Sequence, residues 1–137
     1  MGIEGVIKIG VATKDMDESY RLFADVPGMT PGPRGPCEAA GMKVGLCHLG
    51  EVTLELMEPT TPEAPVAKFI DAHGEGLEHV CVRVSDLDGL IERLKSRGIR
   101  LAQDSPVEVE FLSRRARAIL ARRPSCRGVA VQFIEFL

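Results

Sequence analysis

Alternating hydrophobic and polar residues predict five β-strands, in residues 7–12, 42–49, 52–57, 77–84 and 129–134. In the fourth strand the valines at 80, 82 and 84 share one face, and the other face carries His79, Cys81 and Arg83. One face is therefore apolar, and the other presents an imidazole, a thiol and a guanidinium. Such a strand is a candidate wall of a functional site, with Cys81 interpreted as a packing residue.

Helical spacing of apolar residues predicts three helices, which begin near Met16, Thr61 and Ser85. Pro27-Gly28 is expected to stop the first of them. Residues 30–41 are rich in proline and glycine, which predicts a loop without a regular element. Residues 107–112 alternate as a strand does, whereas the basic stretch 114–123 fits either a strand or a helix. These elements together indicate an α+β protein.

The strand and helix pattern occurs twice along the chain. Residues 8–17 align with 79–88 at an offset of 71, and residues 52–57 align with 129–134 at an offset of 77. Under this alignment Lys8 corresponds to His79, and Glu55 corresponds to Gln132. Two such halves predict one curved mixed sheet, with helices on one face and a cleft on the other. By strand alternation, the four polar residues point into that cleft.

Length, composition and charge restrict the class of protein. The 137 residues predict a single domain, and 45% hydrophobic with 27% charged residues is typical of a folded globular chain. A net charge of −3 and 4% aromatic residues argue against nucleic acid and membrane surfaces as partners. We recognise no signal peptide and no membrane-spanning segment, and the four cysteines are widely spaced, so a cytoplasmic protein with reduced thiols is expected.

Three stretches resemble the vicinal oxygen chelate superfamily, which includes the glyoxalase and bleomycin resistance proteins. They are IGVATKDMDES (9–19), LGEVTLELMEPTTPEAPVAKFI (49–70) and GEGLEHVCVRVSDLDGLIERLKSRGIRL (74–101). Within the superfamily they are most similar to the methylmalonyl-CoA epimerase family. The resemblance implies paired βαβββ modules, the first at about 5–58 and the second at about 76–137, with a linker helix at about 59–75. It also implies a homodimer.

The resemblance further implies a divalent metal (Co, Ni, Mn or Zn) in the cleft, with Glu55, His79 and Gln132 as ligands. Lys8 stands where the family has a fourth ligand, a histidine, and a protonated lysine has no lone pair to offer a metal. Two interpretations stay open. Either the three remaining residues hold the metal, or Lys8 replaces its charge and pairs with Glu55. Lys8 and Glu55 are the candidate catalytic residues.

Arginines are the candidate contacts to an anionic ligand. Arg83 shares the face of His79, and Arg115 and Arg117 belong to the basic segment 114–127. Their guanidinium groups match phosphate geometry, so a CoA thioester is an expected small-molecule ligand. The alternatives are a strand-edge salt bridge for Arg83 and a solvated surface for the basic segment.

Two functions therefore stay open. The first is an epimerase that moves a proton at the carbon alpha to the carbonyl of a CoA thioester, as methylmalonyl-CoA epimerases do. The second is a non-catalytic or repurposed protein that binds a small ligand in the same cleft, as bleomycin resistance proteins do. The catalytic carboxylate of the epimerases has no counterpart here, because Ala39 stands at its position and Glu38 is one residue away.

Overall fold

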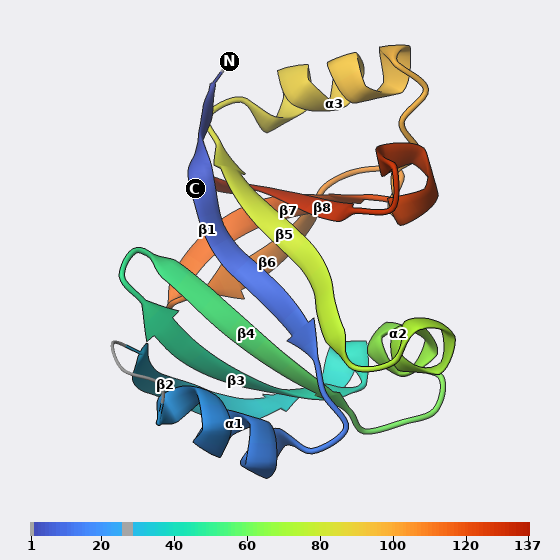
Figure 1. The fold of residues 1–137 in the computed structure, drawn as a ribbon. Coiled ribbons are helices and arrows are strands. Elements are labelled where there is room, and N and C mark those ends of the chain that lie inside the picture. Colours follow the sequence, from blue (N-terminus) through green and yellow to red (C-terminus); the bar gives the residue numbers. More distant parts are fainter. Residues whose placement is uncertain (1, 26–28) are drawn as a thin grey trace. The chain divides into compact units, whose positions relative to one another are not determined.

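The computed structural model describes residues 2–25 and 29–137 of the chain (Figure 1). The chain divides into two compact units, one made of residues up to Ile7 together with His79–Leu137, the other of Lys8–Glu78. We describe each unit by itself, and the single domain stays a prediction. Pro27 and Gly28, expected to stop the first helix, lie outside the described residues. No helix in the described part of the chain combines the length and apolarity needed to cross a bilayer.

The unit Lys8–Glu78 contains a four-stranded mixed sheet in the order β2-β3-β4-β1. Strand β1 pairs parallel to β4, and β3 pairs antiparallel to both β4 and β2. The elements are β1 (Ile3–Ala12), whose first residues belong to the other unit, α1 (Met16–Ala24), β2 (Met29–Cys37), the 3-10 helix η1 (Glu38–Ala40), β3 (Met42–Leu49), β4 (Val52–Pro59) and α2 (Pro65–His73).

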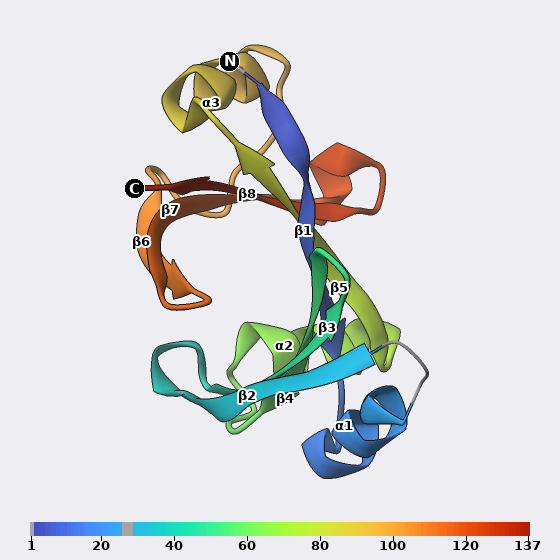
Figure 2. The same cartoon turned by 90° about the vertical axis from the view of Figure 1, so that its left-hand side faces the viewer.

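The other unit repeats this topology, with the strand order β5-β8-β7-β6. Strand β5 pairs parallel to β8, and β7 pairs antiparallel to β8 and β6. Figure 2 shows the strongly bent β6–β7 hairpin in orange. The elements are β5 (Gly76–Val84), whose first residues belong to the unit Lys8–Glu78, α3 (Leu87–Ser96), β6 (Val107–Phe111), β7 (Arg114–Ala121), the 3-10 helix η2 (Arg123–Cys126) and β8 (Ala130–Phe136).

Strand register confirms the internal repeat. The two parallel strand pairs are aligned in the same way once the offsets of 71 and 77 are applied. The corresponding register partners are Lys8↔Thr53 with His79↔Ala130, and Gly10↔Glu55 with Cys81↔Gln132. The predicted α+β class and the two βαβββ modules are therefore confirmed.

The helix starts are duplicated as well. Asp15 caps α1 by accepting a hydrogen bond from the backbone N–H of Glu18, and Asp86 caps α3 by accepting from Gly89. A glutamate on the neighbouring strand accepts from the first helical N–H in each unit. These bonds join Met16 to Glu58 at 2.9 Å and Leu87 to Glu135 at 3.2 Å.

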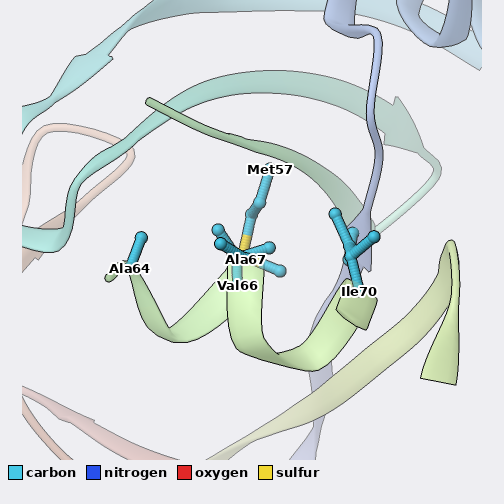
Figure 3. Packing of buried hydrophobic residues seen from close by; sticks show 6 residues of the cluster. Met57, Ala64, Val66, Ala67 and Ile70 are labelled. Carbon is cyan, nitrogen blue, oxygen red and sulfur yellow. The ribbon is translucent and has the colours of Figure 1, made fainter. Parts of the chain in front are cut away.

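Each of these two helices covers one face of its own sheet. Met16 of α1 packs with Cys47 and Leu56, and Leu87 and Ile91 of α3 pack in a cluster with Phe133. Helix α2 packs on β4 instead, where Val66, Ala67 and Ile70 meet Met57 (Figure 3). The segment predicted as a linker helix therefore contributes to the core of the unit Lys8–Glu78.

The prediction of a loop at residues 30–41 is wrong, because β2 occupies Met29–Cys37. This strand pairs with β3 alone, so it lies at the edge of the sheet, where a proline without an N–H is tolerated. The register shifts between Pro31 and Arg34, which absorbs the irregular proline and glycine content. The ambiguous stretch 114–123 forms strand β7 up to Ala121.

Candidate functional site

Strands β1 and β4 bring Lys8 and Glu55 together. In the parallel register Lys8 lies opposite Thr53, and Glu55 lies opposite Gly10, so the two side chains are diagonal neighbours on one face. The Nζ atom of Lys8 is 3.4 Å from Oε1 of Glu55. Lys8 as a whole is only 7% exposed. The pairing of Lys8 with Glu55, one of the two interpretations from sequence, is present in the structure.

Several residues close to this pair in the sheet are buried. Thr53, on the same strand as Glu55, is 3% exposed and shares a hydrogen bond of 3.2 Å with Nδ1 of His48. Met57 follows Glu55 by two residues on the same face, and α2 packs over it together with Ala12. In such surroundings each charge of the pair depends on the other, since removal from water is costly for an isolated ion.

Strands β5 and β8 place His79 and Gln132 in the corresponding positions of the other unit. His79 is buried, and Gln132 lies opposite Cys81 in the parallel register. The Oε1 atom of Gln132 is buried and accepts no hydrogen bond from the described residues. Cys81 is fully buried in a cluster with Ala118 and Ile134, which confirms its interpretation as a packing residue. His79 and Gln132 are both polar, but neither is a carboxylate.

Arg83 lies at the end of β5 and forms an ion pair of 2.7 Å with Glu4. Its guanidinium lies 5.3 Å from the centre of the Phe136 ring, and that of Arg114 lies 3.9 Å from the same centre. Phe136 packs against the cluster that contains Cys81, so this stack lies on the Cys81 face of the sheet. Sequence reasoning did not single out Arg114 for binding, although alternation along 114–121 places it on the face of Ala116 and Ala118.

The other two candidate arginines contact carboxylates. Arg115 is exposed and lies 2.6 Å from Glu108 on β6. Arg117 donates to Glu135 at 2.6 Å and to both oxygens of Asp88 in α3. The hydrogen bond to Glu135 and, to a smaller extent, those to Asp88 raise the pKa of Arg117 above its ordinary value. Arg117 therefore joins β7 and β8 to the start of α3, and the role of both arginines in substrate binding stays a prediction.

In the unit Lys8–Glu78, Lys43 supports the start of α1 in the way that Arg117 supports the start of α3. Its Nζ lies 2.7 Å from Glu58, the glutamate that accepts from the first N–H of α1. Hydrogen bonding to Glu58 raises the pKa of Lys43. In both units, therefore, a cation on one strand and a glutamate on the next support the start of a helix.

The contact between Lys8 and Glu55 does not suit the binding of a divalent metal at Glu55. The described residues contain no group of three or more His, Cys, Asp and Glu side chains that could hold a metal ion. Glu55 already lies beside the ammonium of Lys8, which carries three N–H donors and no lone pair. A divalent cation at Glu55 would be repelled by that charge. Glu55, His79 and Gln132 as metal ligands stay a prediction from the resemblance, and the Lys8–Glu55 pair argues against it.

Comparisons with known proteins agree with this fold. The family model of the Glyoxalase/Bleomycin resistance protein/Dioxygenase superfamily matches residues 8–117. The mitochondrial methylmalonyl-CoA epimerase of Bos taurus is 26% identical over 126 residues, which cover 90% of this chain and 70% of the relative. The predicted resemblance is therefore confirmed at the level of the superfamily.

Solved structures give the same result. Methylmalonyl-CoA epimerase from Mycobacterium tuberculosis superposes with a TM-score of 0.84 at 26% identity, over 97% of this chain and 88% of that one. A hypothetical protein from Bacillus halodurans C-125 superposes with a TM-score of 0.85 at 28% identity, over 95% of this chain and 92% of that one.

Proposed function

The chain belongs to the Glyoxalase/Bleomycin resistance protein/Dioxygenase superfamily, and on that premise we propose that it epimerises the carbon alpha to the carbonyl of a CoA thioester. The observation that carries the proposal is the buried Lys8–Glu55 pair in a chain whose relatives include methylmalonyl-CoA epimerases. A carboxylate can accept the proton from a carbon beside a carbonyl, and an ammonium can stabilise the negative charge that develops on the carbonyl oxygen.

The proposed reaction divides the work between these two residues. The C–H bond at the alpha carbon breaks, and its proton passes to the Glu55 carboxylate. The electron pair of that bond moves to the carbonyl oxygen, which accepts a hydrogen bond from the Lys8 ammonium as negative charge develops on it. The resulting enolate is planar, so a solvent water that protonates its opposite face gives the other epimer. The hydroxide left behind takes the proton from Glu55, which restores the carboxylate.

Arg83 is the proposed contact to an anionic group of the ligand, and Arg114 joins it as a second candidate. Both guanidinium groups lie against the Phe136 ring, and no salt bridge within the described residues involves Arg114. Arginine binds carboxylate and phosphate with two parallel hydrogen bonds, and a CoA thioester carries phosphates. Binding of a CoA thioester, assembly as a homodimer and a cytoplasmic location stay predictions.

One observation favours the alternative, a non-catalytic protein that binds a small ligand. The Glu55 carboxylate is already beside Lys8, and Ala39 in η1 offers no carboxylate where the epimerases are expected to have one. A ligand-binding protein needs a concave site with a few well-placed polar groups but no residue that accepts a proton. The two functions differ in one measurable property, exchange of the alpha hydrogen.

The test is deuterium exchange at the alpha carbon of methylmalonyl-CoA in D₂O, followed by mass spectrometry. We expect exchange with wild-type protein, and a loss of about 100-fold or more in Glu55→Gln, since a general base contributes about 10²–10⁴-fold. Lys43→Met is the control, because it removes an exposed lysine from a different glutamate, Glu58. Exchange no faster than in buffer alone, by folded wild-type protein with and without added metal, would exclude the epimerase and leave the binding protein.

A further inference from the structure

We propose that the Lys8 ammonium takes the place of the divalent metal in this chain, so that its site is built to work without one. The inference deepens the proposed function, on which the catalytic part of it rests. Its structural part concerns only the chemistry of β1 and β4, where Lys8 and Glu55 lie in one unit.

The first step is the equivalence of Lys8 and His79. Both residues occupy the same register position of a parallel strand pair, opposite Thr53 and Ala130 respectively. A histidine at this position offers a neutral ring nitrogen with a lone pair, which a metal can bind. At the equivalent position of the unit Lys8–Glu78, Lys8 offers an ammonium, which only donates hydrogen bonds.

The second step is the charge at Glu55. Its carboxylate is 12% exposed and lies 3.4 Å from the Lys8 ammonium, whose side chain is 9% exposed. One positive and one negative charge are therefore already paired in a site with little access to water. A divalent cation would have to approach the ammonium closely, where repulsion is only weakly screened.

The third step is the chemistry that the ammonium supplies. Lysine presents a compact positive charge with three rotatable donors. Lys8 is anchored through its contact with Glu55, so a donor is in place before an oxygen acquires negative charge, and little reorganisation is needed. The ligand that such a group recognises is a carbonyl oxygen that becomes an enolate oxygen, here that of an acyl thioester.

The experiment is a metal titration of chelator-treated protein with Co²⁺ and with Ni²⁺, read by calorimetry and by the visible absorption of bound Co²⁺. We expect no stoichiometric binding by the wild type. Lys8→His should bind Co²⁺ about 100-fold more tightly than the wild type or better, because it replaces a nearby positive charge by a ligand. Lys43→His is the matched control, since it makes the same change on β3 beside another glutamate, Glu58 of β4, and should gain no such affinity.

Stoichiometric binding of either metal by the wild type, with a Kd in the micromolar range or below, would overturn the inference. A folded Lys8→His protein that binds metal no better than the wild type would also overturn it, because Lys8 would then not be what keeps the metal out. The wild-type titration requires no variant, so it can overturn the inference even when Lys8→His does not fold.

The exchange assay, repeated with and without a chelator, separates this inference from the proposed function. Exchange that persists in the chelator supports both. Exchange that disappears in the chelator and returns with metal overturns the inference and supports the epimerase. No exchange under any condition, together with no metal binding by the wild type and a gain in Lys8→His, supports the lysine-for-metal replacement and excludes only the epimerase.

Discussion

The two units have the same framework but differ at their polar positions. In one unit the parallel strands β1 and β4 carry an ion pair, Lys8 with Glu55. In the other, β5 and β8 carry His79 and Gln132, which form no carboxylate–ammonium pair. The strand registers around these residues are the same after the repeat offsets are applied. Backbone geometry has therefore been kept while the chemistry at equivalent positions has changed.

A second set of polar residues has not changed in this way. Glu58 and Glu135 each accept a hydrogen bond from the first N–H of a helix, and each is paired with a cation, Lys43 or Arg117. These contacts hold a helix on its sheet, which both units need to bury their cores. The contacts that support the helix starts are therefore the same in both units. The positions at which the units differ do not take part in those contacts. The comparison also explains why Arg117 contacts Glu135. Arg117 was predicted to contact a ligand, but its position corresponds to that of Lys43, which supports a helix through Glu58.

The largest expected effect tests the ion pair. Lys8→Met should lower the free energy of unfolding by about 3–5 kcal/mol, because it leaves the buried Glu55 carboxylate without the ammonium. Lys43→Met, at an ion pair whose lysine is half exposed, should cost about 1 kcal/mol or less. Urea unfolding followed by circular dichroism measures both. Equal losses in the two variants would show that burial does not distinguish the pairs.

The second effect tests the shared contacts. Glu58→Ala and Glu135→Ala should each lower the free energy of unfolding by about 1–2 kcal/mol, since each leaves a helix N–H and a cation without their acceptor. Exposed Glu51→Ala is the control and should stay within about 0.5 kcal/mol of wild type. Thermal and urea unfolding of the three variants give the comparison. A loss in only one of the two glutamate variants would contradict their structural equivalence.

The smallest effect tests the diverged positions. Gln132→Leu should raise the free energy of unfolding by about 1 kcal/mol, because the buried Oε1 of Gln132 accepts no hydrogen bond from the described residues. The same change at the equivalent position, Glu55→Leu, should lower it, since the Lys8 ammonium then loses its carboxylate. Urea unfolding of the two variants at pH 7 should therefore give shifts of opposite sign. Shifts of the same sign would show that the two halves of the repeat are equivalent in energy as well as in backbone.

Local pattern was enough for much of the fold. Alternation gave the parallel strands of both units, and it paired Lys8 with His79 and Glu55 with Gln132 as equivalents, because strand parity and repeat offset are properties of the sequence. The strand at Met29–Cys37 was missed, because its prolines and glycines resemble a loop until β3 provides an antiparallel partner. Arg114 is predicted only as a member of the basic segment 114–127, because its stacking on Phe136 depends on the pairing of β7 with β8.

Residue patterns and motifs were sufficient to predict the superfamily, the α+β class, the internal repeat and the residues that carry the candidate chemistry. The contacts that those residues make depend on the folded chain. The tertiary structure showed that Lys8 and Glu55 are in contact and buried, and that Arg117 supports α3 through Glu135 and Asp88. The physical reason is that alternation fixes the face on which a side chain lies, but charge pairing and burial depend on neighbours from other strands and helices.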